Sequence, residues 1–135
     1  MADCVFCQII QRKTLASVVY EDEQVMAFLS NRPVNVGHTL VVPKKHYVDI
    51  YEIPEDEVAY LFRVVKLLTH AVRDATGNAA IRIVQNNGIN AGQVIFHLHV
   101  HIIPMETGNH IIQQNGFRNV DLLDQDAQKI KQQIK

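Results

Sequence analysis

The sequence predicts an α+β domain, in which helices pack against an antiparallel sheet. Several short stretches are rich in β-branched residues and end at turn residues, and two of them lie close enough to form a hairpin. Two longer stretches instead repeat apolar residues at helical spacing. The chain has 135 residues, 47% hydrophobic and 20% charged, with no internal repeat or linker, so we expect a single domain over residues 1–135.

The first half of the chain is predicted to hold a short helix and three strands. "CVFCQIIQ" (4–11) spaces its apolar residues as a short helix does. "SVVYED" (17–22) and "QVMAFLS" (24–30) are interpreted as strands joined by an acidic turn, and "HTLVVP" (38–43) as a third strand. Proline and glycine mark the intervening stretch "NRPVNVG" as a loop.

The second half begins with the clearest helix, over residues 53–78. Acidic residues occupy its first turn, and Gly77 stands where a C-terminal cap belongs. Its apolar stripe consists of Leu61, Val65, Leu68 and Val72. His70 has no partner in the sequence and is interpreted as a surface or boundary residue. Strands follow at 79–85 and 93–103, with the Gly- and Asn-rich "NNGINAG" between them.

Residues 105–135 are expected to form a carboxyl-terminal extension with an amphipathic helix. The apolar face of this helix consists of Leu123, Ala127, Ile130 and Ile134. Asp121 precedes that face and is the expected N-cap.

Charge and hydropathy exclude several classes of partner. Thirteen basic residues against fourteen acidic ones leave a net charge of −1, so no surface for nucleic acid or membrane is expected. No apolar run approaches the ~20 residues of a membrane span. The start "MADCVFCQII" lacks the basic and apolar regions of a signal peptide, so we expect a cytoplasmic protein.

The stretch "HLHVHIIP" (97–104) places a histidine at every second residue. This is the strand period, so His97, His99 and His101 should line one face at intervals of about 6.6 Å, and Pro104 should end the strand. The other face is apolar: Leu98, Val100 and Ile102. The alternative is a solvated strand face that happens to be rich in histidine, although such faces usually carry Thr, Lys or Glu.

Three imidazoles in a row suit reactions at phosphorus. An imidazole can attack phosphorus, leave again and carry protons near neutral pH. A neighbouring group must hold the other nitrogen of the nucleophile in one tautomer. The upstream run "QNNGINAGQ" (85–93) could offer backbone N–H groups and amides to a phosphate, and its alternative is a plain hairpin loop.

With these residues in view, "HLHVHII" (97–103) resembles the signature of the histidine-triad (HIT) family of nucleotide hydrolases and transferases. "GHTLVVPKKH" (37–46) resembles that family's second landmark, which carries a fourth histidine, here His38. The similarity covers residues 4–104 and is closest in pattern to the bacterial and archaeal hydrolases. It implies a five-stranded antiparallel sheet with two main helices, and a homodimer that joins two sheets into ten strands.

The resemblance also implies a hydrolase that acts at the α-phosphate of a purine nucleotide without an organic cofactor. His99 would attack phosphorus and form a nucleotidyl-histidine that water hydrolyses. His101 and His38 would contact phosphate oxygens or relay protons, and His97 would orient the others. The implied nucleobase pocket consists of Val5, Phe6, Ile9 and Phe28, although ordinary core is the alternative. The other implied substrate contacts are Ser30, Asn31, Asn86 and Gln93.

Departures from the family pattern bear on the substrate. Val94 stands where the phosphoramidase branch has a serine that assists the leaving group, and valine cannot donate a proton. Ser30, followed by Asn31, stands where that branch has a ribose-binding aspartate, whereas the dinucleoside polyphosphate hydrolases use an asparagine. Both departures favour a dinucleoside polyphosphate over a nucleoside phosphoramidate. His101 stands where transferases that act on sugar phosphates carry glutamine, which argues against nucleotidyl transfer.

Cys4 and Cys7 form a C-x-x-C that, in a reducing compartment, favours free thiols or a metal over a disulfide. A thioredoxin-like redox pair would need a preceding strand, which residues 1–3 cannot supply. Some bacterial family members and related uridylyltransferases complete such a site with two histidines, here His46 and His97. The sequence therefore predicts a structural zinc, with two free thiols as the alternative.

The leading interpretation is thus an enzyme that hydrolyses a dinucleoside polyphosphate or a nucleoside phosphoramidate. The alternative is a nucleotide-binding regulatory or interaction module with little turnover, which partners hold through the carboxyl-terminal helix. The intact His99 favours the enzyme, because a pure binder does not need a nucleophile.

Overall fold

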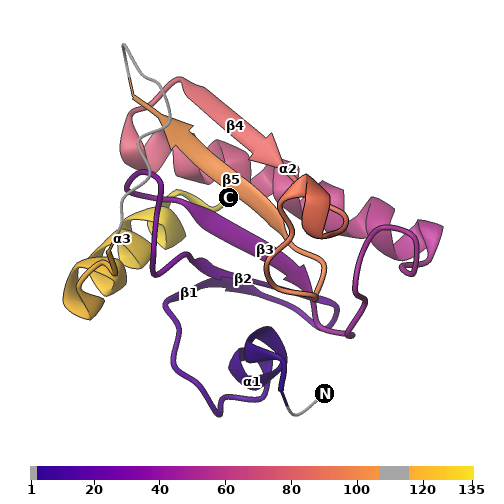
Figure 1. Cartoon of the computed structure of the whole chain (residues 1–135). Coiled ribbons are helices and arrows are strands. Elements are labelled where there is room, and N and C mark those ends of the chain that lie inside the picture. The colour runs from indigo at the N-terminus through magenta and orange to yellow at the C-terminus, as the bar shows by residue number, and fades with distance from the viewer. Residues whose placement is uncertain (1–2, 107–115) are drawn as a thin grey trace.

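The computed structural model describes residues 3–106 and 116–135, which form a five-stranded antiparallel sheet with flanking helices (Figure 1). In chain order the elements are α1 (Val5–Ile10), β1 (Val18–Glu21), β2 (Val25–Leu29), β3 (Thr39–Pro43), α2 (Glu55–Thr76), β4 (Ala80–Val84), the short 3-10 helix η1 (Ile89–Ala91), β5 (Val100–Met105) and α3 (Val120–Gln133). The strands lie in the order β1-β2-β3-β5-β4, and every neighbouring pair is antiparallel. The predicted α+β class is confirmed.

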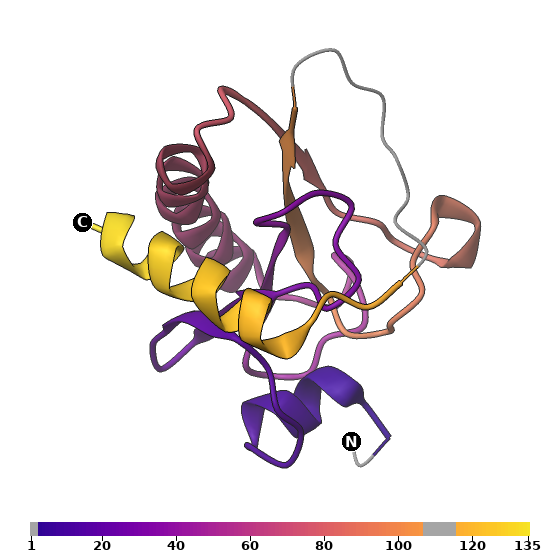
Figure 2. The ribbon, with the colours of Figure 1, turned by 90° about the vertical axis from the view of Figure 1, so that its left-hand side faces the viewer.

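The two long helices cover one face of the sheet. α2 and α3 pack against each other, α2 lies on β3 and β5, and α3 lies on β1 and β2 (Figure 2). The predicted stripe of α2 is buried in the main core, and Gly77 caps the helix in a left-handed conformation with φ of 74°. His70 is exposed on α2, as expected. None of the helices in the described part of the chain is both long and apolar enough to span a bilayer.

Alternation along the strands sorts the side chains between this core and a second one beneath α1. On β2, Ala27 faces the main core, whereas Met26 and Phe28 pack with Phe6 and Ile9 of α1. β3 repeats the pattern, because its Val41 belongs to the main core, whereas Leu40 and Val42 belong to the second core. On β5, Val100 and Ile102 enter the main core, together with Leu98 just before the strand. The intervening histidines therefore lie on the face that α1 covers.

The triad strand begins later than the sequence predicts. We expected a strand over residues 93–103, whereas β5 starts at Val100 and pairs with β3 only through Val41, Leu40 and Thr39. If the same register continued, Leu98 would lie opposite Pro43, which has no N–H to donate. The N–H of Leu98 instead donates to the carbonyl of Tyr47 at 2.7 Å. The side chains of residues 97–99 still alternate between the two faces of the sheet, although the backbone pairing of β5 with β3 stops at Val100.

Two other boundaries also differ from the prediction. Pro104 does not end β5, because it pairs with Ile81 and the strand continues to Met105. β3 does not reach Pro104, because it begins at Thr39 opposite Ile102, and the Pro104 carbonyl accepts instead from the side chain of Asn35 at 2.8 Å. At the start of α3, Asn119 is the N-cap and its side chain accepts from the N–H groups of Asp121 and Leu122, so Asp121 lies in the first turn.

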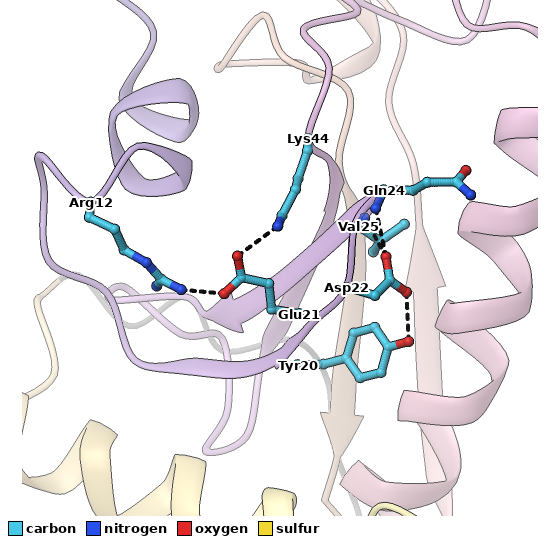
Figure 3. A network of polar contacts seen from close by, with 7 residues as sticks. All are labelled: Arg12, Tyr20, Glu21, Asp22, Gln24, Val25 and Lys44. Carbon is cyan, nitrogen blue, oxygen red and sulfur yellow. Dashed lines mark hydrogen bonds and ion pairs between the residues drawn. The ribbon is translucent and has the colours of Figure 1, made fainter.

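Acidic side chains fasten the β1–β2 hairpin to its surroundings (Figure 3). The Asp22 carboxylate accepts from the hydroxyls of Tyr20 and Tyr60 at 2.7 and 2.6 Å, and from two backbone N–H groups of the turn. Burial disfavours the Asp22 charge, but the hydrogen bonds from the two hydroxyls and the two N–H groups together outweigh burial and hold the pKa of Asp22 below its ordinary value. Glu21 accepts from Arg12, just after the C-cap of α1, and from Lys44 after β3. The hairpin therefore joins α1, the sheet and α2.

Candidate active site and metal centre

The four predicted catalytic histidines lie in one cluster on the α1 face of the sheet. His38 directly precedes β3, His97 and His99 lie just before β5, and His101 is on β5. The ring centroids of His99 and His101 are 4.8 Å apart, and those of His38 and His101 are 5.2 Å apart. His38 and His97 are only 5% and 0% exposed.

Burial keeps these imidazoles neutral near pH 7. It lowers the pKa of His38 to about 3 and that of His101 to about 4, and the repulsion between neighbouring rings adds to both shifts. Burial also lowers the pKa of His99, although the hydrogen bond to the His97 carbonyl opposes this. Each neutral ring carries one proton, and its hydrogen bonds decide which nitrogen holds it.

The backbone fixes His99 in the tautomer that a nucleophile needs. Its Nδ1 lies 2.7 Å from the carbonyl oxygen of His97. Because a carbonyl only accepts, Nδ1 carries the proton and Nε2 keeps its lone pair. The Phe6 ring packs edge-on against His99 with centroids 5.1 Å apart, which restrains the ring plane.

A second hydrogen-bond chain sets the tautomers of His38 and His101. The N–H of Val34 donates to Nδ1 of His38 at 3.1 Å, so in the neutral ring the proton is on Nε2. This Nε2 donates to Nδ1 of His101 at 2.9 Å. The proton of His101 is therefore on its own Nε2. This series of hydrogen bonds leaves His101 as a hydrogen-bond donor beside His99, whose Nε2 has a free lone pair.

Most of the predicted base-pocket residues form an apolar wall next to the histidines. Phe6, Ile9 and Phe28 are buried in the second core, and the rings of Phe6 and Phe28 meet edge to face at 5.3 Å. Val5 lies at the surface of α1, 37% exposed. The arrangement has the apolar lining of a base site, but the same residues also serve as core.

The predicted polar contacts lie in two loops. Ser30 and Asn31 follow β2, and the Ser30 N–H donates to the carbonyl of His38 at 2.9 Å. Asn86 is half-buried in the loop after β4. Gln93 is 3% exposed, and its amide accepts from the Gly88 N–H and donates to two carbonyls. These bonds make Gln93 a support of the loop, and its contact with substrate stays a prediction.

The four predicted metal ligands converge on one point. One ligand atom each from Cys4, Cys7, His46 and His97 lies within 4.8 Å of all the others. The Sγ atoms of Cys4 and Cys7 are 3.4 and 3.5 Å from Nδ1 of His97, and that of Cys7 is 3.3 Å from Nδ1 of His46. Tetrahedral zinc, with Zn–S near 2.3 Å and Zn–N near 2.05 Å, separates such atoms by about 3.6 Å. The residues therefore fit zinc.

The surroundings of this cluster also suit a cation. Nε2 of His97 lies 2.8 Å from the carbonyl of Pro43, so it carries the proton and Nδ1 faces the thiols with its lone pair. Burial and the neighbouring Cys4 thiol raise the pKa of the Cys7 thiol to about 11. A pair of thiolates here therefore needs a cation to compensate their charge.

Several groups that position the site were not found from the sequence. They are the carbonyls of Pro43 and His97 and the N–H of Val34, and a backbone group carries no signal in a residue pattern. Sequence reasoning also missed Arg118, whose N–H donates to the carbonyl of Asn31 at 2.8 Å. The side chain of Arg118 binds the buried carboxylate of Asp126 on α3, and the sequence alone does not show that these two residues meet.

Comparison with known proteins agrees with the geometry. Residues 11–108 match the model of the HIT domain. An uncharacterized HIT-like protein of Methanocaldococcus jannaschii is 46% identical over 120 residues, which are 88% of this chain and 92% of that protein. An adenylylsulfatase of Arabidopsis thaliana is 38% identical over 129 residues, 95% of this chain and 66% of that protein. The crystal structure of a zinc-bound histidine triad family protein from Mycobacterium smegmatis is similar with a TM-score of 0.88 at 31% identity, over 98% of this chain and 94% of that one.

Proposed function

The chain belongs to the HIT family, and from that premise we propose that it is a hydrolase that cleaves purine nucleotides at the α-phosphate through His99. The observation that carries the proposal is the hydrogen bond from Nδ1 of His99 to the His97 carbonyl, which leaves Nε2 unprotonated. A pure binding module would have no use for a half-buried imidazole held in this tautomer.

The proposed reaction has two displacements. Nε2 of His99 forms a bond to the α-phosphorus while the bond from phosphorus to the leaving group breaks, which gives a nucleotidyl-histidine. Water then attacks the same phosphorus, the bond to Nε2 breaks, and the nucleoside monophosphate is released. The Nε2–H of His101, set by His38, donates to a phosphate oxygen in both steps.

The proposed base site is the apolar wall beside His99. Its members are Phe6, Ile9 and Phe28, and Val5 would add to it from the surface of α1. Ser30 and Asn31 are proposed to contact the ribose, and Asn86 and Gln93 to lie near the phosphates. Zinc bound by the four converging ligands would supply no chemical step and would tie α1 to the sheet. Because Phe6 lies between Cys4 and Cys7 on α1, the same tie would hold the base wall.

The leaving group is proposed to need little protonation. Val94 is 82% exposed and has no proton to give, so a phosphate-type group should leave more readily than an amine. The adenylylsulfatase activity named for the Arabidopsis relative points to another weakly basic leaving group, sulfate. The preferred substrates would then be dinucleoside polyphosphates or adenylyl sulfate rather than phosphoramidates.

The direct test combines turnover with a search for the covalent intermediate. The protein is assayed with diadenosine tri- and tetraphosphate, adenylyl sulfate and adenosine phosphoramidate, and quenched samples are weighed by intact-protein mass spectrometry. We expect a nucleotidyl adduct in the parent and neither adduct nor turnover in His99→Ala, which should still bind AMP. Turnover in the variant within a few-fold of the parent would exclude His99 as nucleophile. Tight binding of nucleotide by the parent without turnover would favour the regulatory module.

We also propose that the protein forms a homodimer along β4. This strand is at the edge of the sheet and most of its residues are exposed. Ile83 on β4 and Phe62 on α2 are 46% and 39% exposed beside a groove of about 240 Å³. A second copy paired here would join two sheets into ten strands. Sedimentation equilibrium should give a dimer for the parent and a monomer for Ile83→Asp, and a monomeric parent would exclude this arrangement.

A further inference from the structure

We propose that Arg118 is a positioning residue for the histidine cluster, acting through His38. The catalytic consequence rests on the proposed function, whereas the effect on the histidine rings can be observed without turnover. Arg118 and its partner Asp126 lie beyond residues 11–108, the part that matches the HIT domain. The contact therefore gives the carboxyl-terminal helix a role that the family signature does not contain.

The first step is a buried anchor on α3. The Arg118 guanidinium donates to both carboxylate oxygens of Asp126, with Nε–Oδ2 of 2.7 Å and Nη2–Oδ1 of 3.3 Å. The Asp126 side chain is only 8% exposed. Its neighbours Leu123, Ala127 and Ile130 are part of the main core, so the helix that carries the carboxylate is rigidly held. A two-point contact to such a group fixes both the place and the direction of Arg118.

The second step runs from Arg118 to the loop after β2. With its side chain anchored, residue 118 presents its backbone N–H to the carbonyl of Asn31 at 2.8 Å. Next to this bond, the Arg32 guanidinium lies 5.2 Å from the centre of the Phe117 ring. Two adjacent residues of the loop are thus joined to two adjacent residues before α3.

The third step runs along the loop to His38. The N–H of Ser30 donates to the His38 carbonyl at 2.9 Å, and the N–H of Val34 donates to His38 Nδ1 at 3.1 Å. The segment held by Arg118 lies between these two donors. A displaced loop would therefore withdraw the N–H that keeps Nδ1 of His38 unprotonated.

The consequence for the site follows from proton counting. Without the Val34 N–H, neutral His38 can carry its proton on Nδ1, and its Nε2 then accepts instead of donating. His101 must in that case place its proton on Nδ1 to keep the 2.9 Å bond. Its Nε2 would then present a lone pair, not a proton, to the phosphate oxygens. Arg118 thus helps to decide whether His101 attracts or repels the substrate.

The test compares two anchor variants with a matched control. Arg118→Met removes the fork, and Asp126→Asn weakens it while keeping the volume of the side chain. Ser17→Ala is the control, because the Ser17 hydroxyl donates to Asp124 at 2.7 Å and so ties α3 to the residue before β1 by a side-chain bond separate from the Arg118–Asp126 contact. Two-dimensional ¹⁵N–¹H spectra of the imidazole rings report the tautomers of His38 and His101 directly. All spectra are recorded at a temperature at which thermal melts show each protein folded.

We expect the ring signals of His38 and His101 to move toward the opposite tautomer in Arg118→Met, and to a smaller extent in Asp126→Asn. Turnover of the best nucleotide should fall about three- to tenfold, the scale of one weakened hydrogen bond. Ser17→Ala should change neither. Unchanged ring signals in both anchor variants would overturn the proposal, and so would equal changes in Ser17→Ala. If the parent hydrolyses no nucleotide, shifted ring signals still support the positioning role while the proposed function fails.

Discussion

Acidification should destabilise the protein through its buried neutral histidines, and His38 is the best place to measure this. In the unfolded chain a histidine titrates near pH 6.5, whereas in the folded protein burial lowers the pKa of His38 to about 3. Between these values the unfolded chain binds a proton that the folded protein does not. Folding stability is therefore at its full value above pH 6.5 and falls as the pH drops from 6.5 toward 3.

The magnitude follows from the linkage relation. A pH of 5.0 lies about 1.5 units below the pKa of 6.5 of a histidine in the unfolded chain, so protonation stabilises the unfolded state by about 2 kcal/mol. His38 in the folded protein stays neutral at this pH and gains nothing. His101, with its pKa lowered to about 4, contributes a similar amount. Together they should remove about 4 kcal/mol between pH 7.5 and pH 5.0, a large share of the 5–15 kcal/mol that is typical of a domain.

The assay is urea unfolding at pH 7.5 and 5.0 for the parent and two variants. His38→Gln keeps a side chain that can accept from the Val34 N–H but cannot be protonated. The loss between the two pH values should be about 2 kcal/mol smaller in this variant than in the parent. His70→Gln is the control, since His70 is exposed on α2 and outside the cluster. Equal losses in the parent and in His38→Gln would refute the reasoning, because the proton uptake would then belong to other groups.

Three further perturbations test the leaving group, the metal and the hairpin. Val94→Ser should raise turnover of adenosine phosphoramidate more than that of diadenosine tetraphosphate, because only the amine needs a donated proton; equal gains would count against the argument. Protein purified without chelator should hold about one zinc per chain, and Cys4→Ser should release it and lower the melting temperature; two freely titrating thiols in metal-free parent would exclude the site. Asp22→Asn should cost about 2 kcal/mol in urea unfolding, because it weakens the hydrogen bonds of a charged acceptor; a loss under 0.5 kcal/mol would show that the hairpin does not depend on them.

Side-chain periodicity predicted much of this fold, and it failed where backbone partners decide. The alternation in 97–103 correctly separated Leu98, Val100 and Ile102 from the histidines, because burial follows residue type. It could not give the start of β5, since a ladder needs a donor on the neighbouring strand and Pro43 has none. The N-cap of α3 failed for a similar reason, because both Asn119 and Asp121 are good caps and only the chain path decides between them.

The candidate site divides in the same way. The motifs identified the residues that converge, because His38, His46 and the triad each stand in a recognisable pattern. The patterns did not reveal the direction of each imidazole, which depends on the carbonyls and N–H groups around it. Those groups belong to the backbone, which is alike for nearly all residue types, and their positions are fixed by tertiary packing.

His97 illustrates why the direction matters more than the motif. Its Nε2 donates to the Pro43 carbonyl, and its Nδ1 faces the thiols of Cys4 and Cys7. Neither nitrogen is left to exchange a proton with substrate, whether the thiols hold a metal or not. The group that His97 presents to the rest of the triad is instead its carbonyl, 2.7 Å from Nδ1 of His99. In the proposed reaction the first histidine of the triad would therefore contribute by holding the second in place, and this contribution would depend on the segment that carries the predicted metal ligand His97.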